Sequence, residues 1–249
     1  MLPTTIDEVI IALEEIIKKT KSDHNPMGYF AALYCRVTRK VKEGIATGIF
    51  EDGPRMARLD VIFANRYLDA YYLYRQNKKA TSCWEFTFKN ATQYRFIVLQ
   101  HLLLGMNAHI NLDLSIAAAQ TCPGVEINSL KNDFNKINEI LGSLVRKVEA
   151  ELFQIWPSFK YLLRMAGNSD LFFANISMSM AREEAWNFAK ELAALNHEQQ
   201  IICIAKRDLL VTQKAQMVVN PGFRLRLACM LVRHYEKGTV AEKIDMLNK

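Results

Sequence analysis

The sequence predicts an all-α protein, and three observations support this fold class. Turn-forming residues are scarce, with 10 Gly and 6 Pro among 249 residues. Strong helix formers such as Leu, Ala, Lys and Glu are abundant, and apolar residues recur at helical spacing along most of the chain. Half of the residues are apolar, which is enough for a sizeable core. We therefore predict a single compact domain, residues 1–249, of about eight to ten helices around a buried central helix.

The predicted helices follow one another with short breaks. The first spans residues 5–20 and places Ile6, Val9, Ile10, Leu13, Ile16 and Ile17 on one face. Further helices are expected at 29–47, 54–76, 92–120, 128–155, from 167–170 to about 195, at 197–217 and 222–236, with a short one at the C-terminus. The stretch QNKKATSCWEFTFKNA, residues 76–91, has alternating aromatics, which predicts a short strand or an irregular lid.

The central helix, about 92–120, contains the most informative stretch of the chain, FIVLQHLLLGMNAHINLDLSIAAA. It has no Lys, Arg or Glu, and its polar side chains are surrounded by apolar ones. Those polar residues are His101, Asn107, His109, Asn111 and Asp113. Because buried polar groups need partners, this cluster indicates either an internal hydrogen-bond network or an active site.

Residues 106–114 carry two conflicting signals. Apolar and polar residues alternate strictly, which is typical of a strand, whereas the flanking residues are helical and the stretch is poor in β-branched side chains. We favour a helix and keep the strand as the alternative. On a helix, Asn107 and Asn111 lie opposite His109 and Asp113. There they would contact a substrate or cap buried backbone groups.

His109 and Asp113 are the centre of the candidate site. Side chains four residues apart on a helix can reach the same metal ion or the same proton. His101 lies two turns away, and we expect it to be a second proton carrier. Asp60 and Asp69, in LDVIFANRYLDAYY, would complete a zinc or magnesium site. The alternative is a purely structural network in which Asp113 orients His109.

Arg66 lies between those two aspartates in sequence. At spacing i, i+3, Asp69 is its expected partner, and the alternative role of Arg66 is a clamp for a phosphate or carboxylate. Tyr67 and Trp84 belong to an aromatic wall that would line the substrate pocket or simply fill the core.

A second pattern suggests a different chemistry. Asn175, Ser179 and Glu183 have the spacing N-x3-S-x3-E, which suits magnesium bound to a diphosphate and occurs in class I terpene cyclases. Arg233-His234-Tyr235 resembles their late Arg-Tyr pair. The second, aspartate-rich motif of those enzymes is absent from the sequence.

Charge and cysteine content limit the partners. The net charge is +6, but the basic residues are scattered among acids, so we predict no nucleic-acid partner. Five widely spaced cysteines form neither a disulfide framework nor a thiolate zinc site. The amphipathic N-terminus does not resemble a signal peptide, and the central segment is too polar for an easy membrane span. We predict a cytoplasmic protein and leave homo-oligomerisation open.

Three segments carry a family resemblance. LDVIFANRYLDA, VLQHLLLGMNAHINLDLSIA and the later PGF resemble a bacterial family known as a domain of unknown function, and GMNAHINLDL is its most specific signature. A weaker likeness is to the all-helical, zinc-dependent phospholipase C and single-strand nuclease superfamily. His101, Gly105 and His109 match its H-x-x-G-D-x-H pattern approximately, with Met106 at the position of its metal-binding Asp.

These observations together predict an enzyme acting on a small, largely apolar molecule beside the central helix. The expected reaction is metal-assisted hydrolysis or His/Asp acid–base chemistry. Two alternatives stay open: a magnesium-dependent cyclase or lyase acting on a prenyl diphosphate, and a non-enzymatic helical protein that binds a ligand above a structural polar core.

Overall fold

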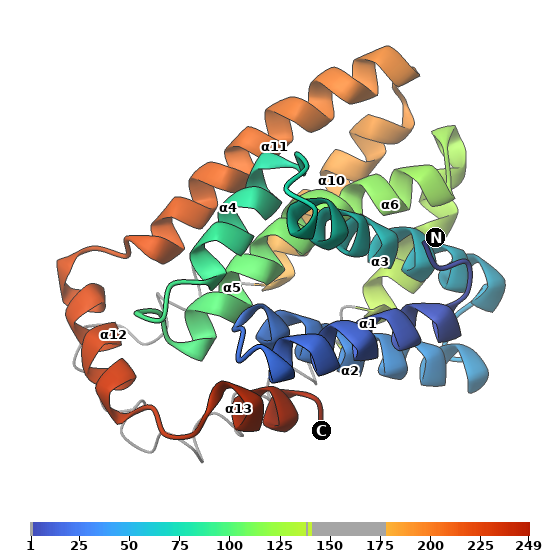
Figure 1. Cartoon of the computed structure of the whole chain (residues 1–249). Helices are drawn as coiled ribbons and strands as arrows, with labels where there is room; N and C mark the ends of the chain where they lie inside the picture. Colours follow the sequence, from blue (N-terminus) through green and yellow to red (C-terminus); the bar gives the residue numbers. More distant parts are fainter. Residues whose placement is uncertain (1, 138, 141–177) are drawn as a thin grey trace.

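The computed structural model describes residues 2–137, 139–140 and 178–249, and this part of the chain is a packed array of helices (Figure 1). The described residues form ten α-helices with defined bounds and contain no strand. The predicted all-α fold is therefore confirmed. In chain order the elements are α1 (Ile6–Ser22), α2 (Met27–Ala46), α3 (Gly53–Arg75), α4 (Ser82–Ala91), α5 (Val98–Ala108), the π-helical turn η1 (His109–Asp113), α6 (Leu114–Thr121), the 3₁₀ turn η2 (Gly124–Leu130), α10 (Met178–Ala193), α11 (His197–Val219), α12 (Phe223–Tyr235) and α13 (Val240–Leu247).

The helices α1 and α3 begin where the sequence places capping residues. Thr5 caps α1 by accepting a hydrogen bond from the backbone N–H of Glu8, whose acidic side chain suits the helix start. Asp52 caps α3 in the same way, and Pro54 occupies its first turn. The bounds of α1 to α3 lie within about two residues of the predicted ones, the usual uncertainty of helix ends.

The prediction of a strand or lid at 76–91 was wrong, because residues 82–91 form the helix α4. Its N-terminus is capped from another helix: the carboxylate of Asp208, in α11, accepts hydrogen bonds from the backbone N–H groups of Ser82 (2.7 Å) and Cys83 (2.9 Å). No local signal reveals this cap, since its donor and acceptor are far apart in sequence.

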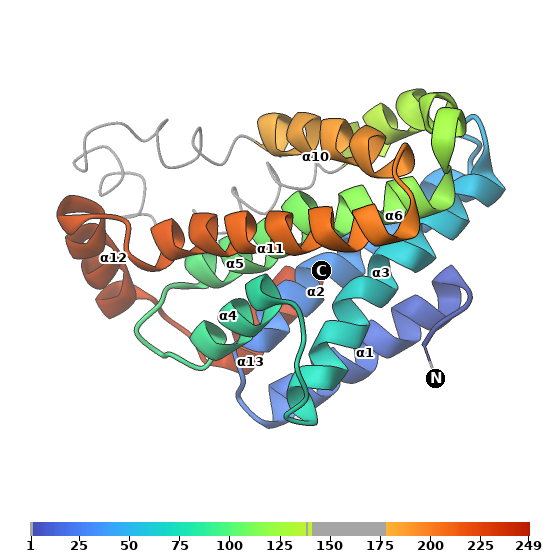
Figure 2. The same cartoon turned by 90° about the horizontal axis from the view of Figure 1, so that it is seen from above.

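The central helix starts at Val98 rather than at residue 92, because 92–97 form turns, and α5, η1 and α6 then run continuously to Thr121. The strand alternative for 106–114 was wrong. Figure 2 shows this helix passing through the middle of the molecule, and it contacts α2, α3, α4, α10 and α11. Residues 98–121 are long and apolar enough to cross a membrane, but 89% of the most apolar window is buried inside the protein, as in a core helix.

The later elements follow the prediction in part. Residues 124–130 form the 3₁₀ turn η2 rather than α-helix, and α-helix follows at 131–137. The remainder of the helix predicted at 128–155 lies mostly outside the described residues. The start of the next predicted helix, from 167–170, also lies outside them, and the described part of that helix begins at Met178.

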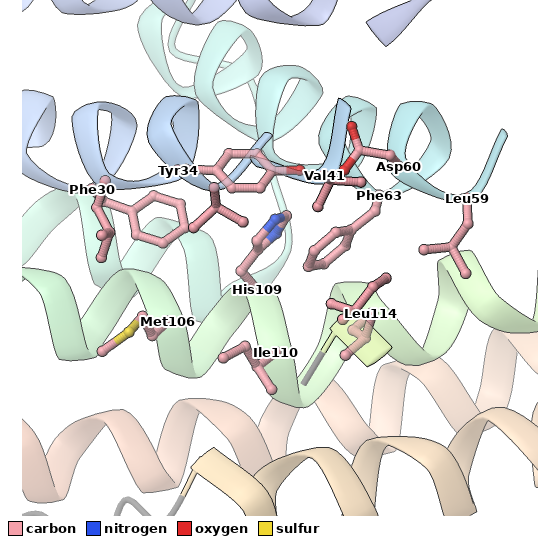
Figure 3. Close-up of a pocket in the computed structure, with 13 residues that line it drawn as sticks. Phe30, Tyr34, Val41, Leu59, Asp60, Phe63, Met106, His109, Ile110 and Leu114 are labelled. Atoms are coloured by element: carbon pink, nitrogen blue, oxygen red, sulfur yellow. The ribbon is translucent and has the colours of Figure 1, made fainter. Parts of the chain in front are cut away.

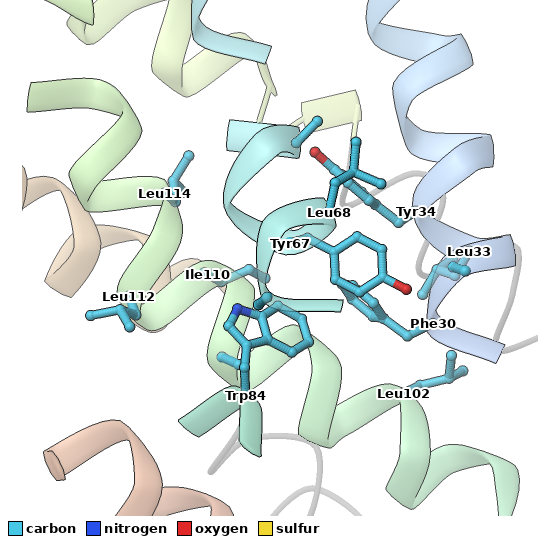
Figure 4. Close-up of a cluster of buried hydrophobic side chains, with 14 of the residues drawn as sticks. Phe30, Leu33, Tyr34, Tyr67, Leu68, Trp84, Leu102, Ile110, Leu112 and Leu114 are labelled. Atoms are coloured by element: carbon cyan, nitrogen blue, oxygen red, sulfur yellow. The ribbon is translucent and has the colours of Figure 1, made fainter. Parts of the chain in front are cut away.

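A group of aromatic side chains fills the core between α2, α3, α4 and α5. Tyr67 packs against Phe30 and Trp84, with ring centroids 5.1 Å apart in both pairs (Figure 4). Gly105 allows α5 to approach α2, since a Cβ at this position would lie 2.4 Å from the ring of Phe30. This packing fixes the wall against which His109 lies.

Candidate functional site

The site forms at a π-helical turn in the middle of the central helix. Over His109–Asp113 the backbone bond runs from the N–H of Leu114 to the carbonyl of His109, one residue further back than in an α-helix. Such short π segments inside α-helices are rare and occur often at functional sites. This turn carries both residues of the predicted His–Asp pair.

Asp113 is fully buried and is the hub of the polar cluster. Its Oδ2 accepts a hydrogen bond from the indole Nε1 of Trp84 (2.8 Å) and lies 3.1 Å from Nδ1 of His109. Its Oδ1 accepts a hydrogen bond from Nε of Arg66 (3.3 Å), whose side chain is 30% exposed. Three donors from three helices therefore hold one carboxylate in place.

His109 is held in one orientation by its neighbours. Its ring stacks on Phe63 with centroids 3.6 Å apart, and the ring of Tyr34 meets it edge-on at 4.4 Å. Burial lowers the pKa of His109 and outweighs the hydrogen bond to Asp113, so the imidazole is neutral. With Nδ1–H donating to Asp113, the tautomer leaves a lone pair on Nε2. Nε2 is buried and has no hydrogen-bond partner among the described residues.

His109 lines a narrow cavity of about 60 Å³ between α2, α3 and the central helix (Figure 3). The walls are mostly apolar, with Val41, Leu59 and Ile110 among them. Asp60 is the exception, because it is a carboxyl group inside the apolar wall. The cavity thus combines an apolar surface with two groups that can exchange protons.

Asp60 and Tyr34 are the other polar groups of this cavity. Burial raises the pKa of Asp60 to about 7, and its Oδ2 has no hydrogen-bond partner in the described part of the chain. Burial, together with the charges of Asp60 and Asp113, raises the pKa of Tyr34 well above its ordinary value, so its hydroxyl stays protonated. The hydroxyl oxygen also lacks a partner among the described residues.

Two predicted interactions of α3 were wrong. Arg66 pairs with Asp113 of the central helix, not with Asp69, which is exposed on the solvent side of α3. For the same reason Asp69 does not join Asp60 in the wall of the His109 cavity. Within residues 2–137, 139–140 and 178–249, no three His, Cys, Asp or Glu side chains form a group that could hold a metal ion. The predicted four-ligand zinc or magnesium site is therefore not assembled from these residues.

His101 lies apart from the His109 cavity. Its ring packs against Tyr29 and Phe96, with centroids 5.5 and 6.1 Å away, and it lines a second, smaller space beside Trp84. Burial and the positive charge of Arg233 lower its pKa to about 3. The structure therefore separates His101 from the cavity that it was predicted to share with His109.

Asn107 and Asn111 face α11. The amide of Asn107 donates to the backbone carbonyl of Val211 (2.9 Å) and accepts from the amide of Asn111 (3.1 Å). The backbone carbonyl of Asn111 accepts a hydrogen bond from Arg207 of α11 (3.0 Å). Both asparagines therefore join the central helix to α11, and neither lines the His109 cavity.

The diphosphate pattern does not converge on this site. Asn175 lies outside the described residues, and Ser179 belongs to the first turn of α10. Glu183 is on the solvent side of α10, where its exposed carboxylate pairs with Lys131 (3.5 Å). Arg233 is engaged by Glu236 and by the carbonyl of Tyr94. The described residues of this pattern therefore do not form a magnesium–diphosphate clamp opposite Asp60, in line with the absence of the aspartate-rich motif from the sequence.

A family model matches residues 6–221, a span that includes α1 to α11 and the whole His109 cavity. The model is that of DUF5995, described as a family of unknown function. The chain belongs to DUF5995. No curated protein and no solved structure matches this DUF5995 chain. The predicted membership of a family of unknown function is confirmed.

Two side chains that contact His109 in this DUF5995 cavity, Tyr34 and Phe63, were not among the residues predicted from the sequence. Phe63 lies three residues after Asp60 and so on the same side of α3, which was a usable signal. Tyr34 gave no such signal, because it stands in an apolar stretch of α2 and reaches His109 only through the packing of α2 on the central helix.

Proposed function

We propose that this protein binds a small, largely apolar molecule in the His109 cavity and transfers protons to and from it. The observation that carries the proposal is the pairing of two groups in one apolar cavity: a neutral imidazole with an unpartnered, buried Nε2 among the described residues, and a carboxyl group with a pKa of about 7. Two titratable groups whose pKa values have been moved by burial are the usual mark of acid–base catalysis.

His109 is the general base. Its Nε2 accepts a proton from the substrate, and Asp113 stabilises the imidazolium that forms, because Nδ1–H already donates to this carboxylate. Trp84 and Arg66 hold the Asp113 carboxylate in position while the charge on His109 changes. These contacts of Asp113 hold the carboxylate in place for the proton transfer, and they also stabilise the fold.

Asp60 is the general acid. With a pKa of about 7 it is substantially protonated near neutral pH, so it can donate a proton to an oxygen of the bound molecule. Proton removal by His109 and proton donation by Asp60 together shift a double bond and leave the substrate's composition unchanged. A proton-transfer isomerisation of a carbonyl compound balances in this way and is the reaction class that we propose.

The cavity sets the size of what binds. A cavity of roughly 150 Å³ accepts benzene. The cavity of about 60 Å³ therefore holds the reacting end of a molecule and not the whole of a large one. Metal-assisted hydrolysis, the other predicted route, would need ligands beyond those that the described residues bring together.

The test is solvent-proton exchange. Purified protein is incubated in deuterated water with small branched and cyclic ketones, and deuterium incorporation is followed by mass spectrometry. We expect His109→Asn and Asp60→Asn each to lose about 100-fold or more of the exchange rate. Asp69→Asn, an exposed carboxyl group on the same helix, is the matched control and should keep the native rate.

The outcomes separate the alternatives. Ligand binding that survives in His109→Asn, with no exchange in the native protein, would support a non-enzymatic binding protein. If a bulky Leu114→Trp substitution that fills the cavity leaves exchange unchanged, the His109 cavity is not where the reaction occurs, and the proposal fails.

A further inference from the structure

The exposed apolar side chains of the molecule concentrate on α11 and α12. Ten of the large hydrophobic residues that are exposed in the described part of the chain lie between residues 201 and 235: Ile201, Ile202, Leu209, Leu210, Met217, Phe223, Leu227, Met230, Leu231 and Tyr235. Figure 1 shows α12 at the edge of the molecule, after the end of α11. Apolar side chains exposed in such number on two neighbouring helices are a mark of an interaction site.

The apolar side chains of α12 form a stripe that faces away from the protein. Val232 is the buried residue of this fully described helix, and Phe223 lies on the opposite side, nine residues earlier. Leu227 and Met230 lie next to Phe223 on that outer side, and the three are 50 to 82% exposed. The outer side of α12 therefore presents apolar side chains where a typical surface helix presents charges.

The charges that flank this stripe are positive. The sequence FRLRLACMLVRHY contains three arginines and no acid, and Arg224 and Arg226 are exposed on either side of the stripe. Glu236, the first acid after α12, is buried and pairs with Arg233 and Lys243. The exposed surface of α12 thus combines apolar side chains with two arginines, Arg224 and Arg226, for which the described part of the chain supplies no acidic partner.

We propose that α12 docks on an anionic membrane surface. A basic amphipathic helix lies in the interface of a bilayer with its apolar side chains among the acyl chains and its arginines at the phosphates. A second copy of the chain fits this surface less well, because a symmetric contact would bring the same arginines together. The contact is peripheral, and it is independent of the function proposed for the His109 cavity.

The test is co-sedimentation of the full chain with vesicles. Vesicles of two parts phosphatidylcholine to one part phosphatidylserine are compared with vesicles of phosphatidylcholine alone. We expect binding to the first and little to the second, with a loss of binding as salt is added. Each arginine near an anionic surface strengthens binding about fivefold, so Arg224→Gln combined with Arg226→Gln should weaken binding about thirtyfold.

Two matched controls accompany the variants. Lys78→Gln combined with Lys79→Gln removes the same net charge from an exposed turn away from α12 and should bind as the native protein does. Phe223→Ser should weaken binding about tenfold or more, whereas Val125→Ser, at another highly exposed position, should not. Because all six substituted residues are exposed, circular dichroism should show unchanged folding in the four variants.

Three results would overturn the proposal. The first is no sedimentation with anionic vesicles at low salt. The second is equal loss of binding in the control variants. The third is the absence of vesicle binding together with another contact that Phe223→Ser abolishes, either a dimer or binding to a soluble polyanion such as heparin. That result would make the surface of α12 a contact for a protein or a polymer.

Discussion

The carboxyl group of Asp60 should make the protein less stable as the pH rises, and the structure gives the size of the effect. Its pKa rises from 3.8 to about 7 on folding, so the folded state holds this proton more tightly than the unfolded state. Between these two pKa values the unfolded chain binds fewer protons, and the free energy of unfolding therefore falls as pH increases. The full shift corresponds to roughly 4 kcal/mol.

The substitution Asp60→Asn isolates this effect. The free energy of unfolding is measured by urea denaturation, followed by circular dichroism, at about pH 5 and about pH 8. The native protein should lose roughly 3 kcal/mol relative to Asp60→Asn between the two conditions, since part of the cost is already present at the lower pH. The amide has its own burial cost, but that cost does not depend on pH.

The deciding measurement is the difference in the free energy of unfolding between the native protein and Asp60→Asn. His101 and His109 have lowered pKa values, so they change stability in the opposite direction below about pH 6.5. These contributions are common to both chains and cancel in the difference. Asp69→Asn, exposed on the same helix, should follow the native curve. Parallel curves for the native protein and Asp60→Asn would refute the burial of an unpartnered carboxyl group, and with it the acid assigned to the site.

Three further predictions follow from single contacts. Asp113→Asn should reduce the free energy of unfolding by about 3–5 kcal/mol, measured by urea denaturation, because it leaves the charge of Arg66 without its buried partner. Gly105→Ala should reduce it by about 1–3 kcal/mol, because the new Cβ would meet the ring of Phe30; an unchanged melting temperature would contradict the close approach of α5 and α2. His101→Leu should make the protein more resistant to acid. Because the pKa of His101 is lowered on folding, the native protein loses stability as the pH falls from about 6.5 towards 3, and the Leu variant should not share this loss. Urea midpoints of both proteins at about pH 4 and pH 6 measure the difference.

The sequence was informative where polarity was unexpected. His109 and Asp113 stood out because they interrupt an apolar helix, and the structure places their side chains 3.1 Å apart. The helix itself could be predicted from its flanks, but the π turn could not, because no residue type marks it. The polar pair and its helix were therefore predictable, and the backbone geometry that presents the pair was not.

The wrong predictions of site partners share a cause: spacing along a helix gives local neighbours only. Asp69 lies three residues from Arg66, yet the arginine turns to Asp113 on another helix, where burial makes the ion pair and hydrogen bond stronger. Glu183 has the spacing of a metal ligand, yet it lies on the side of α10 that meets solvent. The order of residues does not reveal which side of a helix is covered when the covering elements are distant in sequence.

The other buried acids among the described residues, unlike Asp60, have carboxylates that are held by hydrogen bonds. Asp133 accepts hydrogen bonds from two backbone N–H groups and from Arg55, and Asp208 caps α4. Among the described residues, Asp60 is the one acid with a buried oxygen that lacks a partner. A group that costs several kcal/mol and that an apolar residue could replace is not explained by packing. Asp60 lines the same cavity as His109, and a ligand that meets both groups, as proposed above, would account for its unpartnered oxygen.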